Sequence, residues 1–262
     1  MAEHNIAAGD RVPTVIVDDA HVIYRVHGSA APGSGSPVAG LKRLLTGTRT
    51  AAVREVHAIK GVSFVAYKGE AIGLIGSNGS GKSTMLRAIA GLLPVAKGAV
   101  YAAGQPSLLG VNAALMNDLS GERNVALGCL AMGMTPAQVK EQTAGIIEFS
   151  GINARGDFSS MPMRTYSSGM AARLRFSIAA AKKHDVLLID EALATGDAKF
   201  RRRSEQRVRD LRAEAGTVFL VSHTNQSIRD TCERAIWLEA GELRADGPTE
   251  DVLKEYEAFM GK

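Results

Sequence analysis

The sequence contains few cysteines and no long hydrophobic run. Its two cysteines, Cys129 and Cys232, lie far apart and form no C-x-x-C pair, so their spacing indicates neither a zinc site nor a thioredoxin-like motif. Two isolated thiols are typical of a cytosolic protein with reduced cysteines. The longest uncharged stretch, residues 98–117, is interrupted by polar residues, glycines and a proline, so we expect no membrane-spanning helix. Residues 1–20 contain four acidic residues and no apolar segment, which disfavours a secretory signal.

Neither sign of charge is in large excess. Lys and Arg total 31 against 27 Asp and Glu, which gives a net charge of +4. This balance disfavours nucleic acid as the main partner. With 262 residues, of which 45% are hydrophobic, the chain can form one large domain or two modest ones with a buried core.

Short apolar runs alternate with helical stretches along most of the chain, which predicts an α/β fold. The expected strands are 14–26, 62–67, 71–75, 186–189, 217–221, 235–238 and 242–245, and the expected helices are 82–90, 122–132, 136–149, 168–183, 198–215, 226–232 and 249–260. Residues 1–12 are expected to be a flexible N-terminus, and residues 28–40 a Gly/Ala/Ser/Pro-rich loop. Residues 41–54 carry basic side chains beside leucines, which fits either contact with a membrane or partner, or an ordinary surface insertion.

A glycine-rich segment after the expected 71–75 strand matches the phosphate-binding pattern G-x-x-x-x-G-K-[ST] at every position. Its residues are Gly76, Ser77, Asn78, Gly79, Ser80, Gly81, Lys82, Ser83 and Thr84. Glycines permit turns that a Cβ would obstruct, and the backbone amides then form an anion nest at a positive helix end. Lys82 is expected to reach the β- and γ-phosphates of a nucleotide, and Ser83 to place its hydroxyl on Mg²⁺.

A second motif follows the expected strand 186–189. Asp190 and Glu191 end this apolar run at the carboxyl edge of a strand, where α/β sheets place their ligands. Downstream of a phosphate loop, Asp190 is expected to hold Mg²⁺, and Glu191 to orient or deprotonate the attacking water.

The segment T-Y-S-S-G-M, residues 165–170, precedes an expected helix and resembles the Leu-Ser-Gly-Gly-Gln signature of ABC-type ATPases. Ser167 and Gly169 match this signature, whereas Tyr166, Ser168 and Met170 differ from it. The resemblance implies that Ser167, Ser168 and Gly169 of one subunit face the γ-phosphate bound by another. A helix N-terminus with a hydroxyl and free amides suits an anion. The sequence has no Asn-Lys-x-Asp motif, which disfavours a GTPase.

Further positions follow from this resemblance alone. Asp197 occupies the place of the family's D-loop aspartate, and His223, after Val221-Ser222, matches the switch histidine expected to contact the γ-phosphate. Residues 28–54 correspond to an insertion before the second strand that the resemblance implies. The adenine-stacking residue is either Tyr24, by its position before this 28–54 insertion, or His57, by its closeness to the next strand, and we favour Tyr24. No glutamine stands where the family has its Q-loop, near residue 111.

The resemblance extends over residues 24–260 and implies an ABC-type P-loop ATPase with a RecA-like core, an antiparallel β subdomain and an inserted helical subdomain at about 112–183. Residues 13–262 are then one ATPase domain. The segments YSSGMAARLRFSIA, LLIDEALATGDAKF and GPTEDVLKEY resemble ATP-binding subunits of polysaccharide exporters for lipid-linked O-antigen, teichoic acid, capsule or cell-wall galactan. The arginine-rich, alanine-rich composition is most similar to mycobacterial galactan exporters.

This resemblance implies an ATP hydrolase that uses ATP and Mg²⁺ and works as a homodimer. Its partner would be a polytopic membrane permease, which handles the lipid-linked glycan while the ATPase lies peripherally on the cytoplasmic face of the membrane. The alternatives are the ATPase of another exporter or an importer, and a non-transport ABC ATPase.

Overall fold

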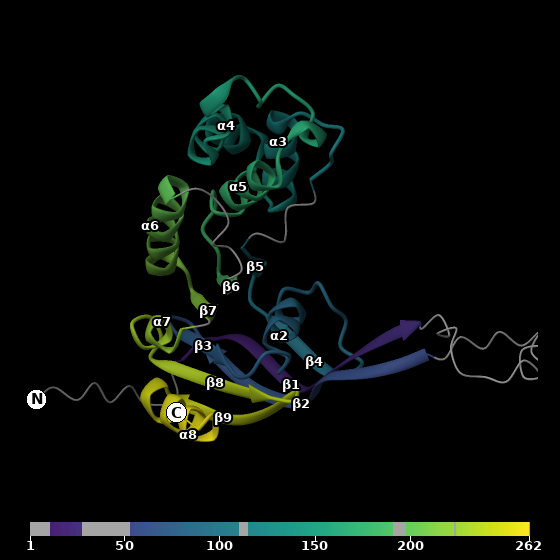
Figure 1. Cartoon of the computed structure of the whole chain (residues 1–262), viewed down its shortest axis with the longest axis vertical. Helices are drawn as coiled ribbons and strands as arrows, with labels where there is room; N and C mark the ends of the chain where they lie inside the picture. Colours follow the sequence, from purple (N-terminus) through teal and green to yellow (C-terminus); the bar gives the residue numbers. More distant parts are fainter. Residues whose placement is uncertain (1–10, 28–52, 110–114, 191–197, 223, 262) are drawn as a thin grey trace, which may run out of the picture.

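The computed structural model describes residues 11–27, 53–109, 115–190, 198–222 and 224–261 (Figure 1). The strands are β1 (Pro13–His27), β2 (Val53–Tyr67), β3 (Ala71–Ile75), β4 (Lys97–Ala102), β5 (Ser107–Leu108), β6 (Val186–Asp190), β7 (Thr217–Val221), β8 (Arg234–Glu239) and β9 (Glu242–Pro248). The α-helices are α2 (Lys82–Ile89), α3 (Gly121–Ala131), α4 (Pro136–Ser150), α5 (Ser168–Ala179), α6 (Ala198–Glu214), α7 (Asn225–Arg229) and α8 (Thr249–Phe259), and the 3₁₀ turns are η1 (Ile152–Arg155) and η2 (Met163–Thr165).

The strands form two sheets. An antiparallel sheet has the order β2-β1-β4, and a six-stranded sheet has the order β5-β6-β7-β3-β8-β9. In the larger sheet only β9 is antiparallel to its neighbour. Strand β7 is buried along its whole length, as expected for a parallel strand covered on both faces. The α/β fold predicted from the alternating pattern is confirmed.

One hydrophobic core joins the two sheets to helix α2. Val22 and Phe64 of the small sheet belong to the same buried cluster as Leu74 and Phe219 of the large one and Leu86 of α2. The rings of Phe64 and Phe219 lie 6.1 Å apart. Burial of this shared apolar surface fixes the small sheet against the large one.

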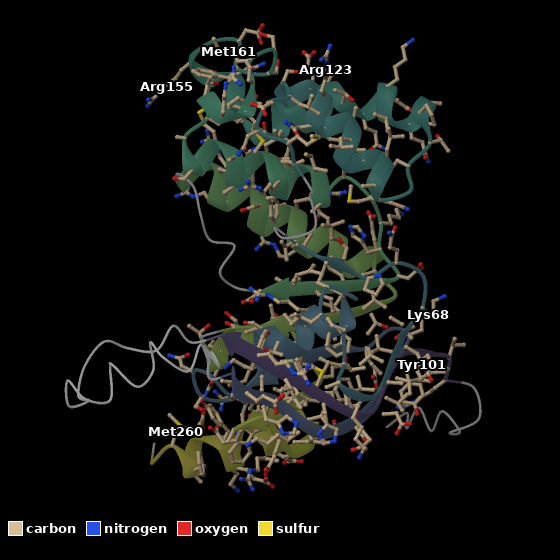
Figure 2. The ribbon with its side chains drawn as sticks, turned by 90° about the vertical axis from the view of Figure 1, so that its right-hand side faces the viewer. Lys68, Tyr101, Arg123, Arg155, Met161 and Met260 are labelled. Atoms are coloured by element: carbon tan, nitrogen blue, oxygen red, sulfur yellow. The ribbon has the colours of Figure 1, made fainter. Side chains whose placement is uncertain are left out.

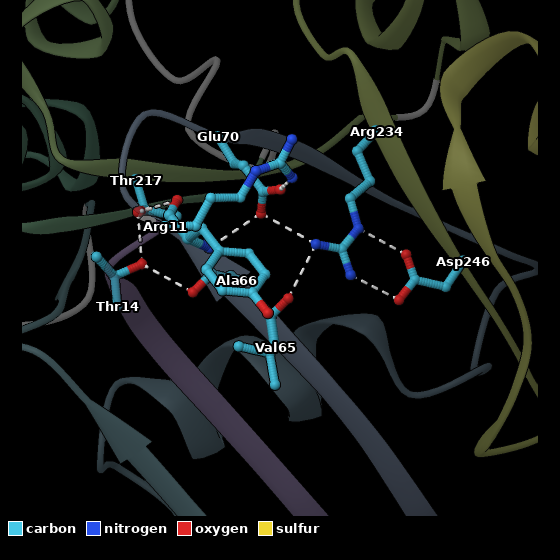
Figure 3. Close-up of polar contacts among 9 residues, drawn as sticks. Arg11, Thr14, Val65, Ala66, Glu70, Thr217, Arg234 and Asp246 are labelled. Carbon is cyan, nitrogen blue, oxygen red and sulfur yellow. Dashed lines mark hydrogen bonds and ion pairs between the residues drawn. The ribbon is translucent and has the colours of Figure 1, made fainter. Parts of the chain in front are cut away.

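Polar contacts also connect the two sheets (Figure 3). Arg234 of β8 donates two hydrogen bonds of 2.7 Å to Asp246 of β9 and one of 3.0 Å to Glu70, which precedes β3. It also donates to the carbonyl of Val65 in β2 at 2.9 Å. This planar guanidinium therefore holds the edge of β2 against the β8–β9 hairpin.

Helices α3, α4 and α5 form a separate group with its own core, which Figure 1 shows at the top, away from the sheets. Val125, Ile146 and Leu174 are among its buried residues. Helix α4 begins with a capping box, in which Thr135 and Gln138 each bond to the other's backbone amide. This group occupies the described part of the predicted helical subdomain.

The side chains at the two ends of the long axis are exposed. Figure 2 shows Arg123, Arg155 and Met161 at the outer end of the helical group and Met260 at the opposite end, beyond α8. No helix in the described part of the chain has the length and apolar character needed to cross a membrane.

Several predicted elements differ from the observed ones. Strands β4 and β5 were not predicted, and β2 begins earlier than residue 62. Helix α5 ends at Ala179 instead of residue 183. The carbonyl of Ala179 is hydrogen-bonded to the ring of His184 at 2.8 Å, and the carbonyl of Ala180 accepts two hydrogen bonds from Arg207. These side chains occupy carbonyls that a longer helix would use. Most of the predicted flexible N-terminus, residues 1–10, and most of the 28–54 insertion lie outside the described residues.

Candidate functional site

The glycine-rich segment forms a tight loop between β3 and α2. Gly76, Gly79 and Gly81 have φ angles of 142°, 82° and 109°, which side chains rarely adopt. A Cβ on Gly76 would collide with the carbonyl of Leu238, and one on Gly81 would lie 2.8 Å from the carbonyl of Ala58. The loop therefore needs glycine at all three positions for its backbone conformation, and at Gly76 and Gly81 also for close packing against neighbouring strands.

The ammonium of Lys82 lies within this loop. Its Nζ donates hydrogen bonds of 2.8 Å to the carbonyls of both Gly76 and Ser77. Burial lowers the pKa of Lys82, while the nearby carboxylates of Glu239 and Asp190 oppose this shift without cancelling it. A partly desolvated ammonium at a helix N-terminus provides a favourable position for an anion such as a phosphate.

Ser83 and Asp190 come together although they lie 107 residues apart. The hydroxyl of Ser83 donates a 3.0 Å hydrogen bond to Asp190 Oδ2, at the carboxyl end of β6. Mg²⁺ prefers hydroxyl, carboxylate and phosphate oxygens, so this pair fits the ion. The described residues contain no group of three or more His, Cys, Asp and Glu side chains suited to a metal, so substrate oxygens and water would have to complete the shell.

The remaining loop residues have different surroundings. Ser80 is buried at 1% exposure, and within the described part of the chain its hydroxyl has no hydrogen-bond partner. Its carbonyl accepts from the amide of Gly241 at 3.0 Å. Asn78 is exposed at the outside of the loop. The hydroxyl of Thr84 lies 3.3 Å from that of Tyr24.

Tyr24 and His57 lie in different surroundings. Tyr24 packs against the core beside α2 and reaches Thr84, one residue after Ser83. His57 is exposed, lies opposite Ile23 in the β1–β2 register, and its Nε2 is 3.0 Å from Nδ1 of His21. Side chains alternate between the faces of a strand, so a residue paired with Ile23 lies on the opposite face from Tyr24. Of the two candidates, Tyr24 is the one next to the phosphate loop.

The signature-like segment caps helix α5. Ser167 is the N-cap and accepts a hydrogen bond from the amide of Met170 at 3.2 Å. Ser168 is exposed at the first turn, and Gly169 follows it. Figure 1 places α5 in the helical group and α2 beside the sheets, so one chain carries the two motifs on separate parts of the fold.

Several predicted site residues lie outside the described residues. These are Glu191, Asp197, His223 and the expected Q-loop positions near residue 111. Their roles remain predictions. The described structure adds one acidic residue, Glu239, that contacts the loop through Ser77. The sequence placed Glu239 at the carboxyl end of an expected strand. It did not show that this strand, β8, pairs with β3, and it is this pairing that brings Glu239 close to the loop.

Comparison with known proteins gives one matching family, described as ABC transporter, over residues 59–194. The teichoic acids export ATP-binding protein TagH of Enterococcus faecalis is 42% identical over 203 residues, which are 78% of this chain and 45% of that protein. The corresponding protein of Lactococcus lactis is 39% identical, over 82% of this chain and 46% of its own length. The chain thus spans less than half the length of these two relatives. The protein of the same name from Staphylococcus saprophyticus is 41% identical over 78% of this chain and 76% of its own.

Two solved structures show the same fold. One, an ATP-binding subunit of an ABC transporter, matches with a TM-score of 0.67 and 21% identity over 93% of each chain. The other, a dimeric ATP-binding cassette in a post-hydrolysis state bound to ADP and Pi, matches with a TM-score of 0.64 and 20% identity over 90% of this chain and 98% of its own.

Proposed function

We propose, from the premise that this chain belongs to the ABC transporter family, that it is the ATP-hydrolysing subunit of an exporter for lipid-linked polysaccharide. The observation that carries the proposal is the phosphate loop, with the Lys82 ammonium inside it and Ser83 bonded to Asp190 beside it. Residues 13–262 would form one ATPase domain, with residues of about 112–183 as its helical subdomain.

In this proposal the loop binds the phosphates of ATP. The amides from Asn78 to Thr84 surround the anion, and Lys82 exchanges its two carbonyl partners for the β- and γ-phosphates. Ser83 and Asp190 hold Mg²⁺, which when bound supplies positive charge to the phosphate oxygens. Tyr24 stacks on the adenine. Positioning and electrostatics then account for most of the catalysis, as in phosphoryl transfer generally.

Two copies would share each reaction site. Ser167, Ser168 and Gly169 of one copy, together with its Asp197, would face the γ-phosphate held by the other. Glu191 would orient or deprotonate the attacking water, and His223 would contact the γ-phosphate. The separation of the two motifs on one chain supports this arrangement, because a second copy is then needed to complete the site.

The partner we propose is a polytopic permease that holds the ATPase on the cytoplasmic face of the membrane. A cavity of about 270 Å³ lies between the helical group and the sheets, and would receive side chains from a cytosolic helix of this permease. Leu92 after α2 and Met132 after α3 line it, and Leu92 is 45% exposed. A helix seated there would contact both parts, whose relative movement would transmit force. Leu92→Asp should abolish copurification of the permease in detergent while ATP binding persists, whereas Val12→Asp, at an exposed position before β1, should not.

The exported glycan is the finer part of the proposal. Similarity to teichoic acids export proteins supports the polysaccharide class. Within that class we propose a cell-wall galactan precursor, with teichoic acid, O-antigen and capsule as the alternatives. Depletion of the protein should cause a galactose-rich lipid-linked glycan to accumulate in the cytosolic leaflet. Accumulation of a polyol-phosphate glycan instead would favour teichoic acid.

Two substitutions test the ATPase assignment. Glu191→Gln should bind ATP, lose turnover and remain as a stable dimer, and near-normal steady-state hydrolysis would contradict the assignment. Lys82→Ala should lose nucleotide affinity, whereas Lys68→Ala, at an exposed lysine outside the loop, should not. A non-transport ABC ATPase is the second candidate, and the absence of any copurifying polytopic protein would favour it.

A further inference from the structure

We propose that Glu239, the last residue of β8, is a positioning residue that holds the first turn of the phosphate loop in its nucleotide-binding shape. The inference rests on the proposed function, because the loop has to bind a nucleotide for its shape to matter. Glu239 lies 162 residues after the loop residue that it contacts. The proposed function assigns roles to the loop, Ser83, Asp190 and the signature segment, but none to Glu239.

The carboxylate of Glu239 binds Ser77 at two points. The backbone amide of Ser77 donates to Glu239 Oε2 at 3.3 Å, and the hydroxyl of Ser77 donates to Oε1. The indole of Trp237 donates to Oε2 at 3.4 Å. Both carboxylate oxygens are therefore engaged, and the amide of Ser77 is directed toward Glu239. The amides left for a phosphate are then those that follow Ser77.

The hairpin that carries Glu239 holds the loop at neighbouring points as well. The amide of Gly241 donates to the carbonyl of Ser80 at 3.0 Å, and the carbonyl of Gly241 accepts from Lys60 at 2.8 Å. The carbonyl of Leu238 occupies the space that a Cβ on Gly76 would need. The β8–β9 hairpin thus contacts the loop at Gly76, Ser77 and Ser80. Among the contacts described at these three residues, the one to Ser77 is made by a side chain, that of Glu239, and the other two by the backbone.

The charge of Glu239 has an effect opposite to that of its hydrogen bonds. Burial raises the pKa of the Glu239 carboxyl, but hydrogen bonds from Ser77 and Trp237 and the charge of Lys82 together hold it below its ordinary value. An ionised carboxylate beside bound phosphates repels them. A residue whose main effect was this repulsion would weaken nucleotide binding, and its removal would strengthen it. If Glu239 mainly positions the loop, its removal should weaken nucleotide binding instead.

The experiment measures the affinity of the full chain for Mg·ATP in three variants, below the temperature at which any of them begins to unfold. Glu239→Ala removes both acceptors, and we expect about tenfold weaker binding, equivalent to about 1.4 kcal/mol. Glu239→Gln keeps one acceptor oxygen for Ser77 and should bind within about threefold of wild type. The matched control is Glu242→Gln, which removes the same charge from the exposed start of β9. It should bind like wild type.

Hydrolysis kinetics separate positioning from a merely structural role. Glu239→Ala should raise KM for ATP more than it lowers kcat, because the reacting groups themselves remain in place. Ser77→Ala tests the same contact from the other side, and should weaken binding about threefold even if Glu239→Ala does not fold.

Unchanged or tighter ATP binding by Glu239→Ala overturns the inference. So does a lower melting temperature with unchanged affinity of the folded protein. If Glu239→Ala does not fold, unchanged affinity in Ser77→Ala overturns it. Failure of wild type itself to bind Mg·ATP, with no difference from Lys82→Ala, overturns the proposed function and the inference together, so the two failures are distinguishable.

Discussion

The hydroxyl of Ser83, in the first turn of α2, donates a 3.0 Å hydrogen bond to the carboxylate of Asp190 at the end of β6. Strand β3 leads into α2. In the parallel sheet, β3 and β6 lie on either side of β7, so the carboxyl ends of β3 and β6 are at the same edge. This edge is where α/β sheets bind their ligands. The contact joins the two halves of the proposed Mg²⁺ site.

Ser83→Ala should weaken the apparent affinity for Mg²⁺ in ATP hydrolysis by at least about tenfold, since even residues behind metal ligands commonly cost that much. Titration of ATPase activity with Mg²⁺ measures the effect. Because Ser83 is exposed, the melting temperature of the Ser83→Ala variant should stay near that of wild type. Asp118→Asn, which removes a surface carboxylate bonded to Arg164, is the control and should leave the titration unchanged. Equal Mg²⁺ dependence in Ser83→Ala and wild type would remove Ser83 from the metal site.

Glycine-to-alanine substitutions should raise or lower the free energy of unfolding according to the backbone conformation of the glycine. Gly81→Ala should destabilise the fold by at least about 2 kcal/mol and abolish ATP binding, because a positive φ and contact with the carbonyl of Ala58 act together. Gly79→Ala, which has a positive φ but open space, should cost about 1 kcal/mol. Gly145→Ala in α4 has open space and no positive φ, and should stabilise by about 0.5–1 kcal/mol. Denaturant unfolding measures all three, and an equal loss in Gly81→Ala and Gly79→Ala would contradict the close-packing argument.

Asn124→Ala should destabilise the fold by about 3 kcal/mol. The fully buried Asn124 accepts from the amide of Met116 at 2.8 Å and donates to the carbonyls of Met116, Leu119 and Ser120. Removal of the side-chain amide deprives the Met116 amide of its acceptor. It also takes one of two donors from each of the three carbonyls, which keep their backbone hydrogen bonds. Urea unfolding measures the loss. Asn225→Ala removes a hydrogen bond to Glu257 at a half-buried site and should cost about 1 kcal/mol or less. Similar losses in both variants would show that the Asn124 network adds nothing to stability.

His184 should make the fold less stable in mild acid. Burial lowers its pKa below 6.5, Lys182 and Arg207 add to this shift, and the hydrogen bond to Ala179 and the charge of Asp185 oppose it. Below about pH 6.5 the unfolded chain therefore binds a proton here that the folded chain does not. Its contribution to the free energy of unfolding is present above that pH and falls as the pH drops.

His184→Gln should therefore lose less stability than wild type between about pH 7.5 and pH 5.5, as measured by urea unfolding across that range. A wild-type slope in His184→Gln would contradict the assignment of this titration to His184.

Contiguous patterns in the sequence predicted much of the fold. Strands 71–75 and 217–221 were predicted with their observed bounds, because strands buried on both faces are apolar at nearly every position. Strand β4 was missed, because its segment KGAVYA shows no alternation of apolar and polar residues and none of its residues is buried. The two-residue β5 is too short for any periodicity. The end of α5 depends on His184 and Arg207, which lie beyond the helix in the sequence. Their side chains form hydrogen bonds with the carbonyls of Ala179 and Ala180, in place of the backbone amides that would continue the helix.

The sequence by itself determined the phosphate loop, because the glycines and Lys82 that shape it lie within residues 76–82 and the Lys82 ammonium bonds to carbonyls of that same segment. The tertiary structure decided which distant residues complete the site. The contacts of Ser83 with Asp190 and of Ser77 with Glu239, and the placement of Tyr24 rather than His57 beside the loop, depend on strand order and register. Local periodicity reports which face of an element is buried, but it contains no information on which other element covers that face.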